Sequence, residues 1–218
     1  MTTRERIVDE ALTLFSIKGF KGTSVKNIAD AVGIKDSSLY KHFKSKREIF
    51  DTIVLKMRKR MECMTEQIGL PDEEKLEEAA KFYGRITLED LQEFSRKAFL
   101  FYLKDEFISR FWRLANMEQY QNPEIYEIYR QIFMEESIAY QKQLFSMMIH
   151  NGSFAKGDPQ IMAISFYAPI FFLLSKYNGR EEVDSEALAI LDREIQDCQH
   201  IYSRKTQEKE STRAGLSL

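Results

Sequence analysis

The sequence predicts an all-α fold, with a short amino-terminal helical domain joined by a linking helix to a larger helical domain. Apolar residues recur at helical spacing through nearly all of the 218 residues. The chain has only four prolines, and nowhere do apolar and polar residues alternate over a strand-length segment bounded by turns. A hydrophobic content of 44% beside a charged content of 30% is typical of a soluble globular protein.

Two helices are expected before the turn at residues 33–35. The first ends at Gly19 and carries one apolar face at positions i, i+4, i+7 and i+8: Ile7, Ala11, Leu14 and Phe15. Ser24 is placed to cap a second, short helix that ends at Gly33. The inward residues of this second helix are Val25, Ile28, Ala29 and Val32. A tight turn then leads to a third helix, capped by Asp36 or Ser37.

The third helix carries an unusual surface, the stretch SSLYKHFKSK at residues 37–46. On a helical wheel at ~100° per residue, Leu39 and Phe43 fall together as a buried seam. The polar residues occupy the rest of the wheel: Ser37 and Lys41 opposite the seam, Ser38 and His42 on one flank, and Tyr40 on the other. This surface could be a catalytic cluster, a solvated helix face, or a surface that contacts a polyanion.

A helix in the major groove of DNA meets base edges along its centre line and phosphates on both sides. In that orientation Ser37 and Lys41 would read bases. Phosphates would be held by the flanking residues and by the first residue of the next helix: Ser38, Tyr40, His42 and Lys46. For Tyr40 and Lys41 the alternative is an ordinary solvated helix surface.

Catalysis is the least supported of the three possibilities. His42 is distant in sequence from His150 and His200, and no carboxylate lies at a metal-ligand spacing from it on this helix. Cys63 and Cys198 lie far apart and outside any CxxC spacing, so neither a disulfide nor a thiolate metal site is expected. We therefore expect a protein that is not an enzyme and has no cofactor and no metal.

Charge is distributed unevenly along the chain, although the net charge is only −2. Residues 1–50 hold ten Lys or Arg against six Asp or Glu, whereas residues 51–218 hold 22 against 28. A basic first segment followed by an acidic remainder indicates that the first segment alone meets a negatively charged partner.

Residues 19–54, GFKGTSVKNIADAVGIKDSSLYKHFKSKREIFDTIV, resemble the DNA-binding region of the TetR family of bacterial transcriptional regulators. The positions that fit the family pattern are Gly19, Phe20, Ser24, Ile28, Ala29, Gly33, Leu39, Tyr40, His42, Phe43, Lys46 and Phe50. The resemblance implies a helix-turn-helix DNA-binding domain over residues 1–48. It also implies that Ser24 touches a phosphate, that Lys26 reaches a base edge, and that Tyr40, His42 and Lys46 contact the DNA backbone.

The turn departs from the family pattern. Where members have a turn such as Ser-Lys-Gly, this chain has Lys35, Asp36 and Ser37. Lys35 is counted among the expected DNA contacts. An aspartate would oppose a phosphate, so Asp36 is expected to cap the helix or to accept a hydrogen bond from a cytosine amino group.

A linking helix is expected from Lys46, with an inner face formed by Ile49, Phe50, Ile53, Val54, Met57 and Met61. Later helix starts are indicated by three cap patterns: Thr87 with Asp90, Asn122 with Pro123, and Asp158 with Pro159. We expect residues 49–204 to form a helical ligand-binding and dimerisation domain. The polar tail, residues 205–218, is expected to be disordered.

Residues 161–174 are the most apolar stretch, and we expect them to form a buried core helix. The stretch is too short to span a membrane and contains Pro169, so no transmembrane segment is expected. The charged start MTTRERIVDE lacks the apolar region of a secretory signal. The expected location is the bacterial cytoplasm, at the nucleoid when the protein is bound to DNA.

The end of the chain carries the narrow seam of a helix that packs along a partner helix, with spacings of 3, 4, 3 and 4: Leu188, Leu191, Ile195, Cys198 and Tyr202. Together with the apolar stretch, this seam is expected to form a four-helix interface between two chains. The expected interface residues are Ile164, Phe171, Leu188, Leu191, Ile195 and Cys198. Packing within a single chain is the alternative.

Aromatic residues are concentrated in the second domain, since 21 of 27 lie between Phe82 and Tyr177, in less than half of the chain. A large core can explain most of them. The TetR resemblance implies a cavity for a small apolar or amphipathic effector. Its candidate lining residues, chosen as bulky and adaptable groups, are Tyr102, Phe107, Phe111, Trp112, Met117 and Phe166.

These features predict a ligand-responsive transcriptional regulator. The expected protein is a repressor that binds a palindromic double-stranded DNA operator as a homodimer and is released by the effector. The alternative is a DNA-binding protein of the same fold that acts architecturally or through a protein partner, without a small-molecule inducer. The two differ in the second domain, which would hold a cavity in the first case and a filled core in the second.

Overall fold

The computed structural model describes residues 1–69, 71, 75–180 and 185–203, and the expected tail at residues 205–218 lies outside them. The chain divides into two compact units. The head unit comprises residues 1–63 and 104–131, and the body unit comprises residues 64–103 and the described residues from 132 on. The domain boundary that we expected at residue 48 falls near the start of helix α4 (Lys46–Gln67), which contributes residues to both units.

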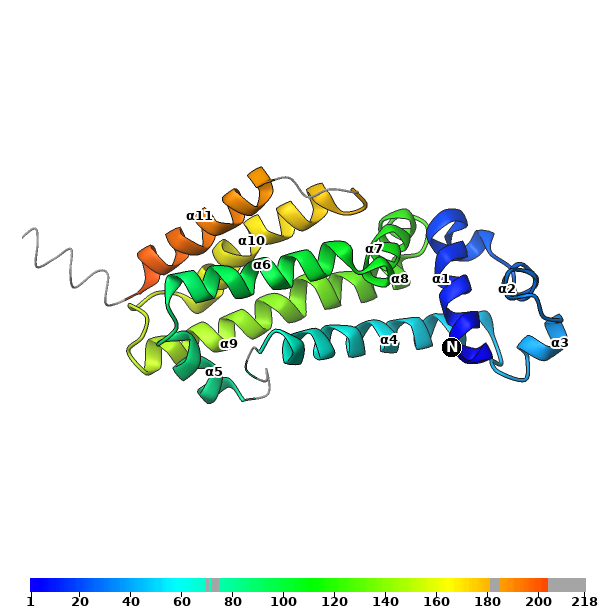
Figure 1. Ribbon diagram of the computed structural model, residues 1–218, viewed down its shortest axis with the longest axis horizontal. Coiled ribbons are helices and arrows are strands. Elements are labelled where there is room, and N and C mark those ends of the chain that lie inside the picture. The colour runs from blue at the N-terminus through cyan, green and yellow to red at the C-terminus, as the bar shows by residue number, and fades with distance from the viewer. Residues whose placement is uncertain (70, 72–74, 181–184, 204–218) are drawn as a thin grey trace, which may run out of the picture. The chain divides into compact units, whose positions relative to one another are not determined.

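The regular secondary structure of the head unit is entirely helical within the described chain (Figure 1). Besides the first part of α4, it contains α1 (Thr3–Gly22), α2 (Val25–Val32), α3 (Asp36–Leu39), α7 (Glu106–Glu118) and α8 (Pro123–Arg130). Helix α1 packs against both α2 and α7, and α2 packs against α3. The head is therefore larger than the sequence indicated, because α7 and α8 pack with the amino-terminal helices.

Local signals in the head act as expected. The chain leaves helical geometry at Gly19, with φ 75° and ψ 164°, so the first helix is kinked where its end was expected. Ser24 accepts a hydrogen bond from the Asn27 amide at 3.1 Å and caps α2. Gly33 ends α2 in the left-handed conformation, with φ 76° and ψ 36°, which glycine adopts at little cost.

Aromatic rings connect three helices through the core of the head. Phe20, at the kink of α1, lies 5.1 Å from Phe15 and 5.7 Å from Phe50 of α4, measured between ring centroids. Phe50 in turn stacks on Phe111 of α7 at 6.3 Å. Three of these four rings have no more than a trace of exposed surface, so the inner face of α4 meets both α1 and α7.

The body unit contains helices and no strand within the part that the structure describes, which confirms the predicted all-α class (Figure 1). Its helices are α5 (Leu76–Tyr83), α6 (Leu88–Lys104), the π-helical segment η1 (Gln131–Glu135), α9 (Glu136–His150), α10 (Pro159–Tyr177) and α11 (Ser185–Tyr202). Helix α9 packs against α5 and α10, and α10 packs against α11. Arg96 of α6 makes a two-bond ion pair with Asp192 of α11, at 2.6 and 2.7 Å.

The expected helix starts are found in the structure. The Asp90 amide donates to the Thr87 hydroxyl at 3.1 Å, and Asp158 accepts from the Gln160 amide at 2.8 Å. Helix α8 begins at Pro123 after Asn122, but the Asn122 side chain makes no capping bond. Two of the three predicted caps are thus made by side chains, and the third position relies on proline at the first helical position.

The π-helical segment η1 was not indicated by the sequence. A π-turn loosens the regular pairing of backbone groups. Here the Tyr167 hydroxyl of α10 donates a 2.5 Å hydrogen bond to the carbonyl oxygen of Phe133 within η1. Burial raises the pKa of Tyr167, while a side-chain hydrogen bond with Ser137 acts in the opposite direction. Tyr167 therefore ties α10 to the irregular turn.

Helix α10 is only partly buried within the chain, so the expectation of a buried core helix was too simple. Its inner face packs in the core through Met162, Ala163, Leu173, Leu174 and Tyr177. The opposite face leaves Ile161 58% exposed, Ile164 41% exposed and Phe172 63% exposed. By length and composition α10 is the one described helix that could cross a membrane, with a mean hydropathy of 1.2, although it is interrupted by Pro169.

Helix α11 buries part of its apolar seam within its own chain. Leu191 and Ile195 are both 1% exposed, whereas Leu188 and Cys198 are half-buried. The intrachain packing that we held as the alternative thus accounts for Leu191 and Ile195, and a substitution of Leu191 would disturb the core as well as any interface.

Cys198 is expected to be unreactive in the folded protein. Burial, with a smaller contribution from the Glu194 carboxylate, raises the pKa of its thiol to about 12. Because the thiolate is the nucleophile and its fraction falls tenfold per pH unit below the pKa, iodoacetamide at pH 8 should modify Cys198 roughly a thousand times more slowly than an ordinary thiol. Mass spectrometry of native and urea-unfolded protein measures this. Rapid native labelling of Cys198 would contradict the buried position.

Candidate nucleic-acid interface

The turn between α2 and α3 is built from backbone bonds. The Gly33 amide donates to the Asp30 carbonyl at 3.1 Å, and the Ile34 amide donates to the Ala29 carbonyl at 3.0 Å. Helix α3 then begins at Asp36, with Lys35 in the cap position and without a side-chain capping bond. The predicted cap by Asp36 or Ser37 was therefore wrong, which leaves both side chains exposed.

Helix α3 is shorter than the helical wheel of the SSLYKHFKSK stretch assumed. Its α-helical part ends at Leu39, and the following turn is tightened by bonds between residues three apart, from the Lys41 amide to Ser38 and from the His42 amide to Leu39. The apolar seam is nevertheless buried, with Leu39 0% and Phe43 1% exposed. We refer to residues 35–46, which include this short helix and the turn after it, as the recognition segment.

All nine predicted DNA-contact residues lie in the head unit. Seven are exposed: Ser24, Lys26, Lys35, Ser37, Tyr40, Lys41 and His42. The other two, Ser38 and Lys46, are half-buried. Tyr40 keeps 54% of its surface exposed although it follows the buried Leu39. The recognition segment therefore presents hydroxyl, phenol, imidazole and ammonium groups on a scaffold fixed by two apolar residues.

Lys46 has partners inside the head. Its ammonium donates to the carbonyl oxygens of Phe20 at 2.6 Å and Thr23 at 2.8 Å, and it lies 4.4 Å from the centre of the Phe20 ring. Burial lowers the pKa of Lys46, and the nearby Glu118 carboxylate partly opposes this. Lys46 therefore holds the end of α1 with two of its three N–H donors, in addition to any contact that the third makes.

Two further arginines stand near the recognition segment and behave differently. The guanidinium of Arg4, at the start of α1, lies 4.5 Å from the centre of the Phe43 ring and is exposed. Arg47 instead pairs with Asp51 at 2.7 Å and Glu124 at 2.6 Å, and these hydrogen bonds raise its pKa. The sequence did not single out Arg4, because only the folded head brings the first turn of α1 beside Phe43.

The six predicted pocket residues do not form one group inside either unit. Phe107, Phe111, Trp112 and Met117 belong to the head, and Tyr102 and Phe166 belong to the body. Phe111 is fully buried against Phe50, and Trp112 meets the edge of the Tyr129 ring at 5.2 Å. Met117 is 39% exposed. The head aromatics are thus packed as core residues.

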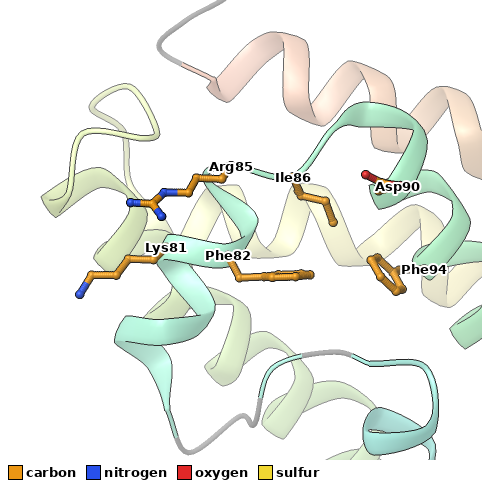
Figure 2. A pocket seen from close by; sticks show the side chains of 6 residues that line it. All are labelled: Lys81, Phe82, Arg85, Ile86, Asp90 and Phe94. Carbon is orange, nitrogen blue, oxygen red and sulfur yellow. The ribbon is translucent and has the colours of Figure 1, made fainter.

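A groove of about 550 Å³ lies in the body where α5 ends and α6 begins. It is lined by Lys81, Phe82, Arg85, Ile86, Asp90 and Phe94, none of which was among the predicted pocket residues. The rings of Phe82 and Phe94 are 6.1 Å apart, and Figure 2 shows them on the apolar side of the groove, with Lys81 and Arg85 extending away. Its volume is within the range of small-molecule sites.

Within the described residues, no group of three His, Cys, Asp or Glu side chains is arranged to hold a metal ion. The exposed side chains of the recognition segment are hydroxyl, phenol, imidazole and ammonium groups, which can donate hydrogen bonds to phosphate oxygens.

Comparison with known proteins identifies the segment that carries this surface. Residues 7–53 match the family model of bacterial regulatory proteins of the tetR family. This segment is a TetR-family DNA-binding segment. Members of the TetR family are DNA-binding transcriptional regulators and not enzymes.

Curated TetR-family relatives match over a short segment. IcaR of Staphylococcus aureus (strain Newman), the negative transcriptional regulator of the biofilm operon icaADBC, is 49% identical over 51 residues, which are 23% of this chain and 27% of IcaR. IcaR of Staphylococcus epidermidis is 47% identical over 47 residues, or 22% of this chain and 25% of that protein. The match spans about a quarter of the length of these curated relatives.

Solved structures of TetR-family proteins share the fold over almost the whole chain. A transcriptional regulator from Pseudomonas syringae pv. tomato superposes with a TM-score of 0.63 at 19% identity, covering 94% of this chain and 99% of that one. SmeT, the repressor of the Stenotrophomonas maltophilia multidrug efflux pump SmeDEF, superposes with a TM-score of 0.61 at 20% identity, covering 94% and 92%. SmeT has also been solved in complex with triclosan.

Proposed function

We propose that the chain is a DNA-binding transcriptional repressor that occupies a palindromic operator as a homodimer in the bacterial cytoplasm. The observation that carries this proposal is the recognition segment, where polar and basic side chains are exposed above a buried seam. The match of residues 7–53 to the tetR family model supports the same function. The role of IcaR as a negative regulator favours repression over activation.

Within this proposal Ser37 and Lys41 read base edges, and Lys26 reaches a further base. Phosphates are contacted by the remaining predicted residues: Ser24, Lys35, Ser38, Tyr40, His42 and Lys46. We add Arg4 to the phosphate contacts, because it is an exposed cation held beside Phe43 by a cation–π interaction. No carboxylate of the described head forms an ion pair with Arg4, in contrast to Arg47.

The exposed face of α10 supports a dimer. Ile161, Ile164 and Phe172 stand at i, i+3 and i+11, so they lie on one side of the helix. A second copy related by a two-fold axis would cover this face with its own α10 and α11. The predicted interface residues Phe171, Leu188 and Cys198 are half-buried beside it, which leaves surface for a partner.

For control of DNA binding we propose a small apolar or amphipathic effector. The body groove beside Phe82 and Phe94 has a suitable size and lining, and it supports such a site in the unit that also holds Tyr102 and Phe166. The complex of SmeT with triclosan is a precedent within the same fold. In the head unit the rings of Phe107, Phe111 and Trp112 are packed as core residues. This packing favours the alternative there, a filled core without an inducer.

Replacement of Lys41 by alanine tests the base-reading assignment. A good contact to a base edge is worth about 1–3 kcal/mol of discrimination, so K41A should bind a duplex selected by the native protein roughly 5- to 150-fold more weakly and should accept other bases at one position of each half-site. Selection from random DNA followed by fluorescence anisotropy measures both effects. The matched control is Lys59→Ala, an exposed lysine on α4. Unchanged base preferences in K41A would refute the assignment.

A further inference from the structure

Glu118, the last residue of α7, is a buried carboxylate that the DNA-contact set does not use. It is 2% exposed. Its oxygen Oε1 accepts a 2.8 Å hydrogen bond from the Phe20 amide, 98 residues earlier in the chain. The second oxygen, Oε2, is buried without a hydrogen-bond partner within the described chain. A buried carboxylate with one unsatisfied oxygen is costly, and the nearby Lys46 ammonium offsets only part of that cost.

The Phe20 amide needs an outside acceptor because of the kink in α1. At Gly19 the backbone leaves helical geometry, so the regular helical pairing is interrupted at this point. The approach of Glu118 is close, since a Cβ added at Gly19 would lie 2.8 Å from Oε1. Glycine at this position thus permits both the positive φ and the contact with the carboxylate.

Charged side chains hold both polar groups of the Phe20 residue. Glu118 of α7 accepts from its N–H, and Lys46 of α4 donates to its C=O at 2.6 Å and to the Thr23 carbonyl at 2.8 Å. Thr23 closes the segment by donating from its hydroxyl to the Gly19 carbonyl at 2.9 Å. Hydrogen bonds with one charged partner are stronger and more directional than neutral ones. Residues 19–23 are therefore held in one conformation from two sides.

Residues 19–23 connect α1 to α2, so their conformation sets the direction of α2 and of the recognition segment relative to α1. Ser24, the cap of α2, follows directly after Thr23, and α2 packs against α3. Helix α7 is tied to α1 a second time by Arg110, which donates to the Thr13 hydroxyl at 2.5 Å and pairs with Asp9 at 2.9 Å. Glu118, which accepts the hydrogen bond from the Phe20 amide, therefore lies on a helix, α7, that is fixed against α1.

We propose that Glu118 is a positioning residue for DNA binding, which orients the recognition segment by fixing the Phe20 backbone. The proposal rests on the DNA-binding function proposed above. It assigns a role in operator recognition to a residue outside the helix-turn-helix segment and without contact to DNA.

The test compares Glu118→Leu, which removes the acceptor, with Glu118→Gln, which keeps a carbonyl oxygen that can accept from Phe20. E118L leaves the Phe20 amide without its acceptor and should lower stability, so its binding is measured under conditions in which circular dichroism shows it folded. Its affinity for the selected palindromic duplex should fall roughly ten- to hundredfold, the range expected for loss of a charge-assisted bond. E118Q should stay within about threefold of the native protein by the same reasoning.

Two readouts separate positioning from a general loss of stability. The salt dependence of binding should keep its native slope in E118L, because no phosphate contact is lost. E118L should also discriminate less between the native half-site spacing and a spacing altered by one base pair, whereas a smaller folded fraction would weaken all duplexes equally. Amide hydrogen exchange at Phe20 should be slow in the native protein and in E118Q, and fast in E118L.

Native affinity and native spacing preference in folded E118L would overturn the proposal. If E118L does not fold, Gly19→Ala applies the same test, because its Cβ would displace Oε1 and strain a residue at φ +75°; native operator binding by G19A would then refute the role. Failure of the native protein to bind any selected duplex would refute the proposed function instead. In that case exchange at Phe20 still decides whether Glu118 fixes this segment.

Discussion

Phe172→Glu is expected to give a folded monomer that has lost operator binding. Phe172 is 63% exposed within the chain, on the same face of α10 as Ile161 and Ile164. In a two-fold symmetric interface each substitution occurs twice, so a carboxylate without a partner would be buried at two places. The monomer keeps one head, and its affinity for the palindrome should fall by roughly a hundredfold or more. Sedimentation velocity measures whether the variant is a monomer or a dimer. Fluorescence anisotropy measures its affinity for the palindrome.

Leu55→Glu is the matched control for this substitution. Leu55 is 68% exposed on α4, so the same change of chemistry is made at an exposed apolar position outside α10 and α11. It should leave both the dimer and the stability almost unchanged, as is usual for surface substitutions. If Phe172→Glu is folded and still sediments as a dimer, the interface does not include this face of α10. Phe172 is a better test than Leu191, which is buried in its own chain.

Much of the head could be predicted because its signals are local. The cap at Ser24, the left-handed turn at Gly33 and the kink at Gly19 each depend on a few neighbouring residues, and all three are present in the structure. The seam of Leu39 and Phe43 was also visible in the spacing of apolar residues. The extent of α3 was overestimated because burial of Phe43 requires only that it point inward, which a tightened turn achieves as well as a helix.

Features that depend on distant contacts could not be predicted. Nothing near Glu118 in the sequence indicates that its carboxylate meets the Phe20 amide, and the aromatic pattern of α7 does not show which unit the helix joins. The π-helical segment at Phe133 likewise becomes understandable only with the Tyr167 hydroxyl beside it. The apolar seam of α11 indicated burial correctly but left open which chain would bury Leu191.

The measurement that tests the central claim most directly compares three duplexes at about 0.15 M salt, an ionic strength at which non-specific binding is weak. They are the palindrome selected by the native protein, the same DNA with one half-site scrambled, and random DNA. Two linked heads should bind the palindrome at least about a thousandfold more tightly than random DNA, while the single half-site should lie much closer to random DNA. Equal affinity for all three duplexes would contradict a sequence-reading dimer.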